Sequence, residues 1–227
     1  CNGAPSKGTI TLGPTYAGSL EQTGARIVWA AAAQRNLKVY GADVSNAFAE
    51  APPPVSPLYM EIDEQFCEWW KYKGRGDIPD NHVLPVKRAL QGHPEAPRLW
   101  AKLIDGLIKK KLNLKAMTHE PCLYSGKFQG IDVLFLRQVD DFAIATPDEK
   151  LAQQIIAEIN SHMKVQIKYL GLLTRFNGVD VEQNSDYIKI YNTTYIKKIL
   201  NGHRSWLKPR HCHTFPLPLK SEASFIN

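Results

Sequence analysis

Three acidic residues are placed where they could hold metal ions. Asp43 ends the segment KVYGAD, while Asp140 and Asp141 are adjacent, between the apolar runs VLFL and FAIA. An acidic pair in a hairpin is commonly no more than a polar turn. Here apolar strands bring the pair next to a core, where neighbouring like charges are costly unless a cation neutralises them. Magnesium prefers carboxylate oxygens and phosphates, and two such ions promote in-line displacement at phosphorus. The three acids therefore predict phosphoryl-type transfer.

The apolar pattern predicts the elements that would position these acids. A strand is expected over 38–44, and strands over 133–139 and from Phe142 onward form a β-hairpin with the two acids at its tip. Helices are expected over 19–36, capped by Ser19, and over 64–72, 97–112, 148–163 and 193–200. Shorter strands are expected over 58–62, 83–86, 122–125 and 187–191, and within 165–181. The inward face of the 97–112 helix is predicted to comprise Leu99, Leu103, Leu107 and Ile108. The class is α+β, with helices packed against a largely antiparallel sheet.

The charge balance suits a polyanionic partner. The chain has 227 residues, with 28 Lys and Arg against 22 Asp and Glu, for a net charge of +6. Basic residues cluster at Lys109–Lys115 and again at Lys197–Arg210. A solvated helix face or tail would explain either cluster equally well, so the charge alone only favours nucleic acid as a partner.

Several classes of protein do not fit the sequence. The four cysteines are widely spaced, which favours reduced thiols in an intracellular protein over a disulfide framework. The run His211-Cys212-His213 could bind zinc but lacks a second pair of ligands at finger-like spacing. No apolar stretch could span a membrane and no secretory signal is visible. Because it starts at Cys1 rather than Met, the chain is interpreted as part of a longer protein.

Several segments together resemble a known family. From about Gly24 to Leu200, the stretches DVSNAF, QGHPEAPR, VLFLRQVDDFAIA and RFNGVDV occur in the order of the polymerase motifs of reverse transcriptases, specifically those of copia-type LTR retrotransposon Pol polyproteins. The resemblance implies a right-hand fold. Residues 1–42 and 52–100 would be partial fingers interleaved with the palm, and residues 43–51 and 101–180 the catalytic palm. Residues 181–227 would begin the thumb or connection and end in an irregular tail.

The resemblance also implies roles for single residues. Asp43, Asp140 and Asp141 would be catalytic and, with the carbonyl of Val44, would hold two Mg²⁺ ions, for which Mn²⁺ could substitute. Nucleotide-binding residues would be Asn46, Ala47, Phe48, Gln91 and Gly92, with Phe48 as the steric gate that selects deoxynucleotides. Primer or template contacts would come from Arg98, Gln138, Val139, Phe176, Asn177 and Gly178. Either Lys164 or Lys168 could protonate the leaving pyrophosphate.

The implied activity is RNA-directed DNA polymerisation from dNTPs on a primed RNA or DNA template. Integrase and RNase H parts would flank the chain in the parent polyprotein, in a cytoplasmic virus-like particle or the nucleus, with no particular oligomeric state implied. Two departures favour an alternative, an inactive remnant that only binds nucleic acid. Gln138 replaces the usual Tyr, and the triphosphate-gripping basic residues of the fingers are not identifiable among Lys7, Arg26, Arg35 and Lys38. A two-metal nuclease would leave Phe48 unexplained.

Overall fold

The computed structural model describes residues 14–79 and 82–202, and it divides the chain into two compact units, residues 1–191 and 192–227. The first unit holds every described residue of the predicted site. The described part of the second is the helix α5 (Thr193–Gly202), which confirms the helix expected over 193–200. The run His211-Cys212-His213, most of the second basic cluster and Lys7 lie outside the described residues. No helix of the described ranges is long and apolar enough to cross a membrane.

A six-stranded sheet forms the centre of the first unit, and all its paired neighbours are antiparallel. Its strand order is β4-β5-β6-β7-β1-β8. The strands are β4 (Leu114–Ala116), β5 (Leu123–Phe128), β6 (Ile131–Gln138), β7 (Asp141–Thr146), β1 (Lys38–Asp43) and β8 (Lys168–Leu172). The predicted hairpin is confirmed as β6–β7, and β1 lies between β7 and β8, which are distant from it in sequence.

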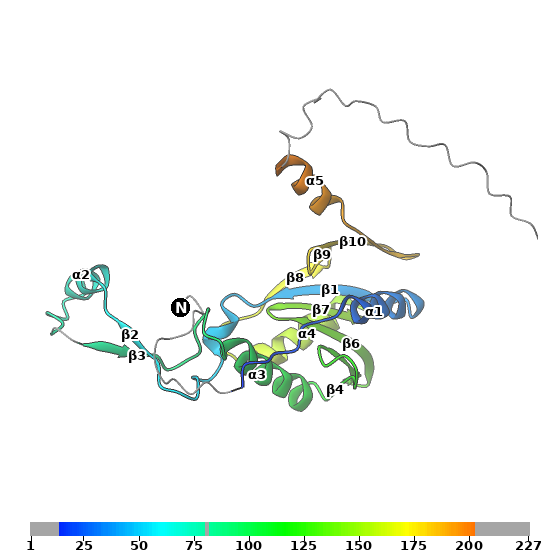
Figure 1. Cartoon of the computed structure of the whole chain (residues 1–227). Helices are drawn as coiled ribbons and strands as arrows, with labels where there is room; N and C mark the ends of the chain where they lie inside the picture. Colours follow the sequence, from blue (N-terminus) through cyan, green and yellow to red (C-terminus); the bar gives the residue numbers. More distant parts are fainter. Residues whose placement is uncertain (1–13, 80–81, 203–227) are drawn as a thin grey trace, which may run out of the picture. The chain divides into compact units, whose positions relative to one another are not determined.

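Two helices pack on one face of this sheet, α3 (Ala96–Lys111) and α4 (Glu149–Asn160) (Figure 1). Asp148, where the sequence predicts the start of this helix, is its N-cap and accepts a hydrogen bond from the Leu151 amide. The predicted inward face of α3 is wrong in part. The helix buries Trp100, Ile104 and Ile108 completely, whereas Leu99, Leu103 and Leu107 are only half-buried beside that core.

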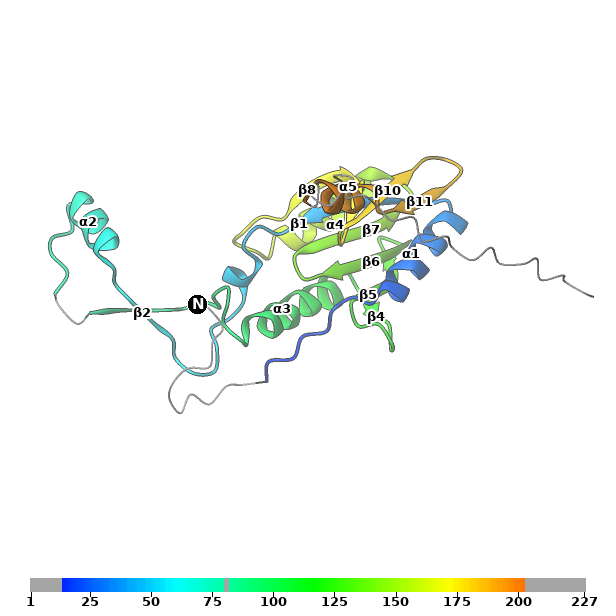
Figure 2. The ribbon, with the colours of Figure 1, turned by 45° about the horizontal axis from the view of Figure 1, so that its top comes forward.

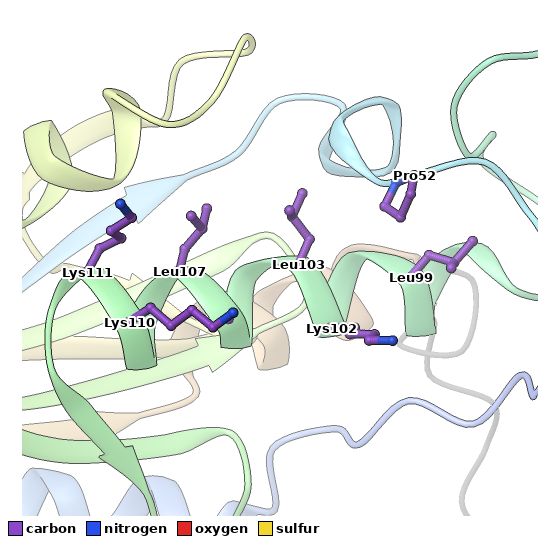
Figure 3. Close-up of a pocket in the computed structure, with 8 residues that line it drawn as sticks. Pro52, Leu99, Lys102, Leu103, Leu107, Lys110 and Lys111 are labelled. Carbon is purple, nitrogen blue, oxygen red and sulfur yellow. The ribbon is translucent and has the colours of Figure 1, made fainter.

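The half-buried leucines of α3 line a groove together with Pro52, and Figure 3 shows them directed toward the chain that carries this proline. Lys102, Lys110 and Lys111 also line it. Lys109, in contrast, pairs with Asp105 on the same helix at 2.9 Å. The first basic cluster is therefore divided between a groove and an ion pair rather than forming one continuous surface.

The helix α1 (Gln22–Gln34) packs on the opposite face of the sheet, across β6 and β7 (Figure 2). The predicted cap is wrong. The N-cap residue is Glu21, whose own side chain makes no capping bond. Its amide instead donates to the Glu120 carboxylate at 2.9 Å. A three-stranded sheet follows the main sheet in sequence and comprises β9 (Arg175–Phe176), β10 (Val179–Gln183) and β11 (Ile188–Tyr191).

The chain between β1 and α3 begins with the 3-10 helix η1 (Ala47–Glu50). It continues into the paired strands β2 (Tyr59–Glu61) and β3 (Val83–Pro85), which enclose the helix α2 (Glu64–Tyr72). The aromatic rings of α2 stack on one another, and the Arg75 guanidinium lies 4.7 Å from the centre of the Trp70 ring. The cysteines of the described ranges, Cys67 and Cys122, are both free thiols.

Candidate active site

Four residues form a row across four neighbouring strands of the main sheet. Gln138 on β6 is paired with Asp141 on β7, Asp141 with Asp43 on β1, and Asp43 with Lys168 on β8. Directly opposed residues of antiparallel strands share one face, with their Cβ atoms about 4.5–5.5 Å apart. Asp43 and Asp141, which are 98 positions apart in sequence, are thus neighbours. Gln138 flanks this pair on the side of Asp141, and Lys168 flanks it on the side of Asp43.

The row lies on the face that carries α1. Ala42 and Phe142, the sequence neighbours of the two acids, are buried in the core beneath α3 and α4, and alternate residues of a strand point to opposite faces. Farther along the same strands, Ala143 and Ala145 pack in the core that contains α1. Asp43 and Asp141 are half-buried and Asp140 is exposed, so all three are accessible to solvent at one end of this face.

The hairpin turn that joins β6 to β7 consists of Val139 and Asp140. Val139 has a φ of +53°, a left-handed conformation that is unfavourable for a β-branched residue but typical of two-residue hairpin turns. The carbonyls of both turn residues accept hydrogen bonds. Trp100 Nε1 donates to the Val139 oxygen at 2.6 Å, and the Val44 amide donates to the Asp140 oxygen at 3.0 Å. The turn is therefore fixed from two separate parts of the chain.

Gln138, at the start of this turn, is also engaged. Its side-chain Oε1 accepts a hydrogen bond at 2.9 Å from the amide of Leu20, just before α1. Nearby, the thiol of Cys122 donates to the carbonyl oxygen of Gly18 at 3.4 Å. The segment preceding α1 is thus bound to the end of β6 and to the residue that precedes β5. A Tyr at position 138, with its longer side chain, would not place its oxygen where the Gln138 oxygen lies.

The electrostatics of the acids suit a cation. The pKa of Asp141 is raised above its ordinary value, first by partial burial and then by the negative charges of Asp140 and Asp43. A bound cation would offset both effects, because it favours the ionised carboxylates. In the side-chain positions of the described ranges, no three Asp, Glu, His or Cys side chains are grouped closely enough to hold one ion. Asp43 and Asp141 are therefore neighbours on paired strands, and Asp140 lies in the adjoining turn. Their carboxylate groups, however, are not gathered around a single point.

The segment after Asp43 is held by a buried carboxylate. Val44 and Ala47 are buried, Asn46 is exposed with a φ of +58°, and Phe48 is half-buried against the core beneath α3. Glu50, only 6% exposed, accepts hydrogen bonds from the amides of Lys164 and Val165 at 3.1 and 2.8 Å. The loop that carries Phe48 is consequently anchored to the turn that follows α4.

The segment 91–98 is connected to that loop. Gln91 and Gly92 are exposed in the turn before α3, and Gly92 has a φ of +85°. The Ala89 amide donates to the Ala51 carbonyl at 3.3 Å, and the buried Glu95 accepts from the Val55 amide at 3.1 Å. Arg98 is half-buried in the first turn of α3. Two of the predicted motifs are thereby brought side by side.

The third predicted segment forms the turn between β9 and β10. Asn177 and Gly178 are exposed and both have positive φ values, +47° and +80°, as a tight hairpin turn requires. Phe176 is buried, and its ring contacts Trp29 of α1 edge-on at 5.9 Å. Asn177 and Gly178 are therefore available to a ligand, whereas the Phe176 ring belongs to the core.

The sequence matches a family model described as "Reverse transcriptase (RNA-dependent DNA polymerase)" over residues 12–205. The chain belongs to the reverse transcriptase family. It is also similar to the "Retrovirus-related Pol polyprotein from transposon TNT 1-94" of Nicotiana tabacum, with 25% identity over 201 residues. That alignment covers 87% of this chain but only 14% of the tobacco polyprotein. Together, the two matches confirm the resemblance to the reverse transcriptase domain of a copia-type retrotransposon.

Family membership indicates the use of a divalent metal ion in general, and the row of acids is the part of this reverse transcriptase that suits one. Motif reasoning did not identify two residues that fix the site. Trp100 lies two positions after the stretch QGHPEAPR, where its indole would ordinarily be interpreted as part of the core. Glu50 follows DVSNAF by two positions. A buried indole nitrogen and a buried carboxylate each require a hydrogen-bond partner. This requirement is the signal that could have pointed to Trp100 and Glu50.

Proposed function

We propose that this chain is the RNA-directed DNA polymerase module of a retrotransposon, which joins dNTPs to the 3′ end of a primer. The observation that carries the proposal is the pairing of Asp43 with Asp141 on adjacent strands, beside Asp140 in the turn, within a reverse transcriptase. In this reaction the primer 3′-oxygen bonds to the α-phosphorus, the bond from that phosphorus to the β-phosphate oxygen breaks, and pyrophosphate leaves.

Asp43, Asp140, Asp141 and the Val44 carbonyl would hold two Mg²⁺ ions, with Mn²⁺ as a substitute. Ions held there would supply Lewis acidity that activates the attacking hydroxyl and positive charge that offsets the leaving pyrophosphate. Because the acids are not gathered around one point in the described structure, binding requires rotation of at least one carboxylate side chain.

Between the two candidate lysines we assign the general acid to Lys168. It lies directly opposite Asp43, in the row that contains the acids, so its amine is on the same face of the sheet. Lys164 belongs instead to the turn that the Glu50 carboxylate holds. A lysine ammonium in that row would donate its proton to the departing pyrophosphate and attract the triphosphate beforehand.

Phe48 is proposed as the steric gate, with Asn46, Ala47, Gln91 and Gly92 around the incoming nucleotide. Its support is its place five positions after Asp43 and the packing of its half-buried ring against the core beneath α3, which fixes the ring. A ring held in this way would exclude a 2′-hydroxyl. Primer and template contacts are assigned to Arg98, Gln138, Val139, Asn177 and Gly178, and to the backbone of the buried Phe176; of these residues, Val139, Asn177 and Gly178 are exposed.

The test is extension of a labelled DNA primer on an RNA template with Mg²⁺. Asp140→Asn should abolish extension, because it removes a proposed metal ligand from an exposed turn without disturbing the core. Asp132→Asn is the matched control, since Asp132 is an exposed acid at the other end of β6. Normal extension by Asp140→Asn would remove that residue from the proposed site.

The second candidate function is nucleic-acid binding without catalysis. It is favoured by the arrangement of the acids, which form no ready ion site in the ranges described. Under this alternative, RNA would bind through the clusters Lys109–Lys115 and Lys197–Arg210, and affinity would fall steeply with salt because counterions are released from the phosphates. Salt-sensitive RNA binding by a protein that never extends a primer, with either Mg²⁺ or Mn²⁺, would favour it over the polymerase.

A further inference from the structure

The indole of Trp100, on α3, makes a contact with the hairpin turn that joins β6 to β7. This turn consists of Val139 and Asp140. Trp100 is completely buried, and its Nε1 donates to the carbonyl oxygen of Val139, 39 positions away, at 2.6 Å. That distance is slightly below the usual range of about 2.7–3.2 Å for an N–H···O hydrogen bond. The interaction joins the second turn of α3 to the one residue of the hairpin turn that has a left-handed backbone.

The turn needs such an interaction. Val139 carries a β-branched side chain at a φ of +53°, where glycine is normally found, so its backbone conformation is strained and persists only if surrounding contacts enforce it. Relieving that strain requires φ of Val139 to become negative, and this rotation about the N–Cα bond of Val139 turns its carbonyl away from the indole. It would also leave the buried indole N–H without an acceptor, which is costly. The hydrogen bond therefore selects the observed turn over its relaxed form.

The peptide between Val139 and Asp140 also determines the position of the Asp140 backbone. The Asp140 carbonyl accepts from the Val44 amide, directly after Asp43, so a change in the turn would also break its link to β1. We propose that Trp100 is a positioning residue, whose indole N–H holds the Val139 peptide and thereby sets Asp140 and Asp141 beside Asp43. This proposal rests on the proposed polymerase function and specifies how its acids are kept in place.

The experiment is a double-mutant cycle between Trp100→Phe and Val139→Gly. Trp100→Phe keeps an aromatic ring in the core but removes the donor. It should lower kcat for primer extension at least tenfold, with little change in the KM for dNTP. Glycine adopts a positive φ without strain, so the turn no longer depends on the donor. In the Val139→Gly background, Trp100→Phe should therefore reduce kcat less than threefold.

The matched control is Trp29→Phe, which makes the same change in the core on the α1 side of the sheet, away from the turn. It should lower the unfolding temperature as much as Trp100→Phe does, but leave kcat within about twofold of the wild type. Three results would overturn the proposal: full kcat in Trp100→Phe, an equal loss in the glycine background, or an equal loss of kcat in Trp29→Phe.

A second readout separates this proposal from the polymerase function itself. If the turn reorients in Trp100→Phe, the Val44 amide loses the Asp140 carbonyl, and its hydrogen exchange should accelerate at least tenfold relative to amides in the middle of β1. Exchange at Val44 that is unchanged would refute the role of Trp100 even in a protein that extends primers. Accelerated exchange in a protein that never extends primers would leave Trp100 as the turn's anchor and refute only the polymerase.

Discussion

Neutralising one of the paired acids should stabilise the metal-free protein. Asp141 has a raised pKa because it is partly buried and faces the charges of Asp140 and Asp43, so its ionised form costs folding free energy. Two unit charges about 5 Å apart repel by about 0.8 kcal/mol in bulk water and about 3 kcal/mol at an effective dielectric constant of 20. Because Asp141 is only half-buried, solvent screening favours the lower part of that range. We expect Asp141→Asn to raise the free energy of unfolding by about 1 kcal/mol, which corresponds to about 2–4 °C in Tm for a chain of this length.

The assay is thermal unfolding at pH 7 with a chelator, with Asp132→Asn as control. Asp132 is exposed and lies opposite Lys127, so removing its charge should leave Tm unchanged or slightly lower. A carboxyl whose pKa is raised by folding binds more protons when folded, so its effect on stability worsens as pH rises above the ordinary value of 3.8. The advantage of Asp141→Asn should therefore disappear below about pH 3.8 and grow as pH rises through the folded pKa. With Mg²⁺ the wild type should gain more stability than the mutant. A mutant no more stable than wild type at pH 7 without metal would refute this account of the site.

Three further predictions concern the surroundings of the acids. Phe48→Ala should raise the incorporation of ribonucleotides relative to deoxynucleotides by at least tenfold, measured as the ratio of kcat/KM values, because the ring that would exclude the 2′-hydroxyl is removed. Lys168→Ala should reduce kcat at least tenfold while Lys164→Ala changes it less than threefold, since only Lys168 lies opposite Asp43; equal effects would contradict the assignment of the general acid. Gln138→Met keeps the length of the side chain but removes the acceptor for the Leu20 amide, so hydrogen exchange at Leu20 should accelerate at least tenfold, whereas Gln138→Glu should preserve its protection.

Local signals in the sequence predicted most of the helices and strands. The helix α4 shows why, because its Asp148 cap and its apolar positions lie within a few residues of one another and need no distant partner. The start of α1 was misplaced because the N-cap residue is Glu21, whose amide is satisfied by Glu120, 99 positions away, and not Ser19. Capping from a distant side chain leaves no local pattern to detect.

The inward face of α3 shows a second limit of periodicity. Leu99, Leu103 and Leu107 form one apolar stripe, and Trp100, Ile104 and Ile108 form the next, about 100° around the helix. Either stripe satisfies a spacing of four residues. The choice depends on what faces the helix, and the indole nitrogen of Trp100 finds its acceptor on the side where the hairpin turn lies. The position of that acceptor depends on the tertiary structure and cannot be predicted from the spacing of apolar residues along α3.

The candidate site has the same dependence on distant partners. Sequence order and family resemblance brought Asp43 and the pair Asp140-Asp141 together, and the register of β1 against β7 supplied their adjacency. Their fixation relies in part on residues outside the motifs, namely Leu20 and Trp100. Three hydrogen bonds hold the β6–β7 hairpin turn and the strand before it. The Leu20 amide donates to the Gln138 side chain, the Trp100 indole to the Val139 carbonyl, and the Val44 amide to the Asp140 carbonyl. These contacts come from the segment before α1, from the start of α3 and from the end of β1. A strained turn in a half-buried acidic cluster opposes folding, so the surrounding contacts must offset both costs. The turn should therefore be more sensitive to loss of these neutral donors than to changes in exposed charge.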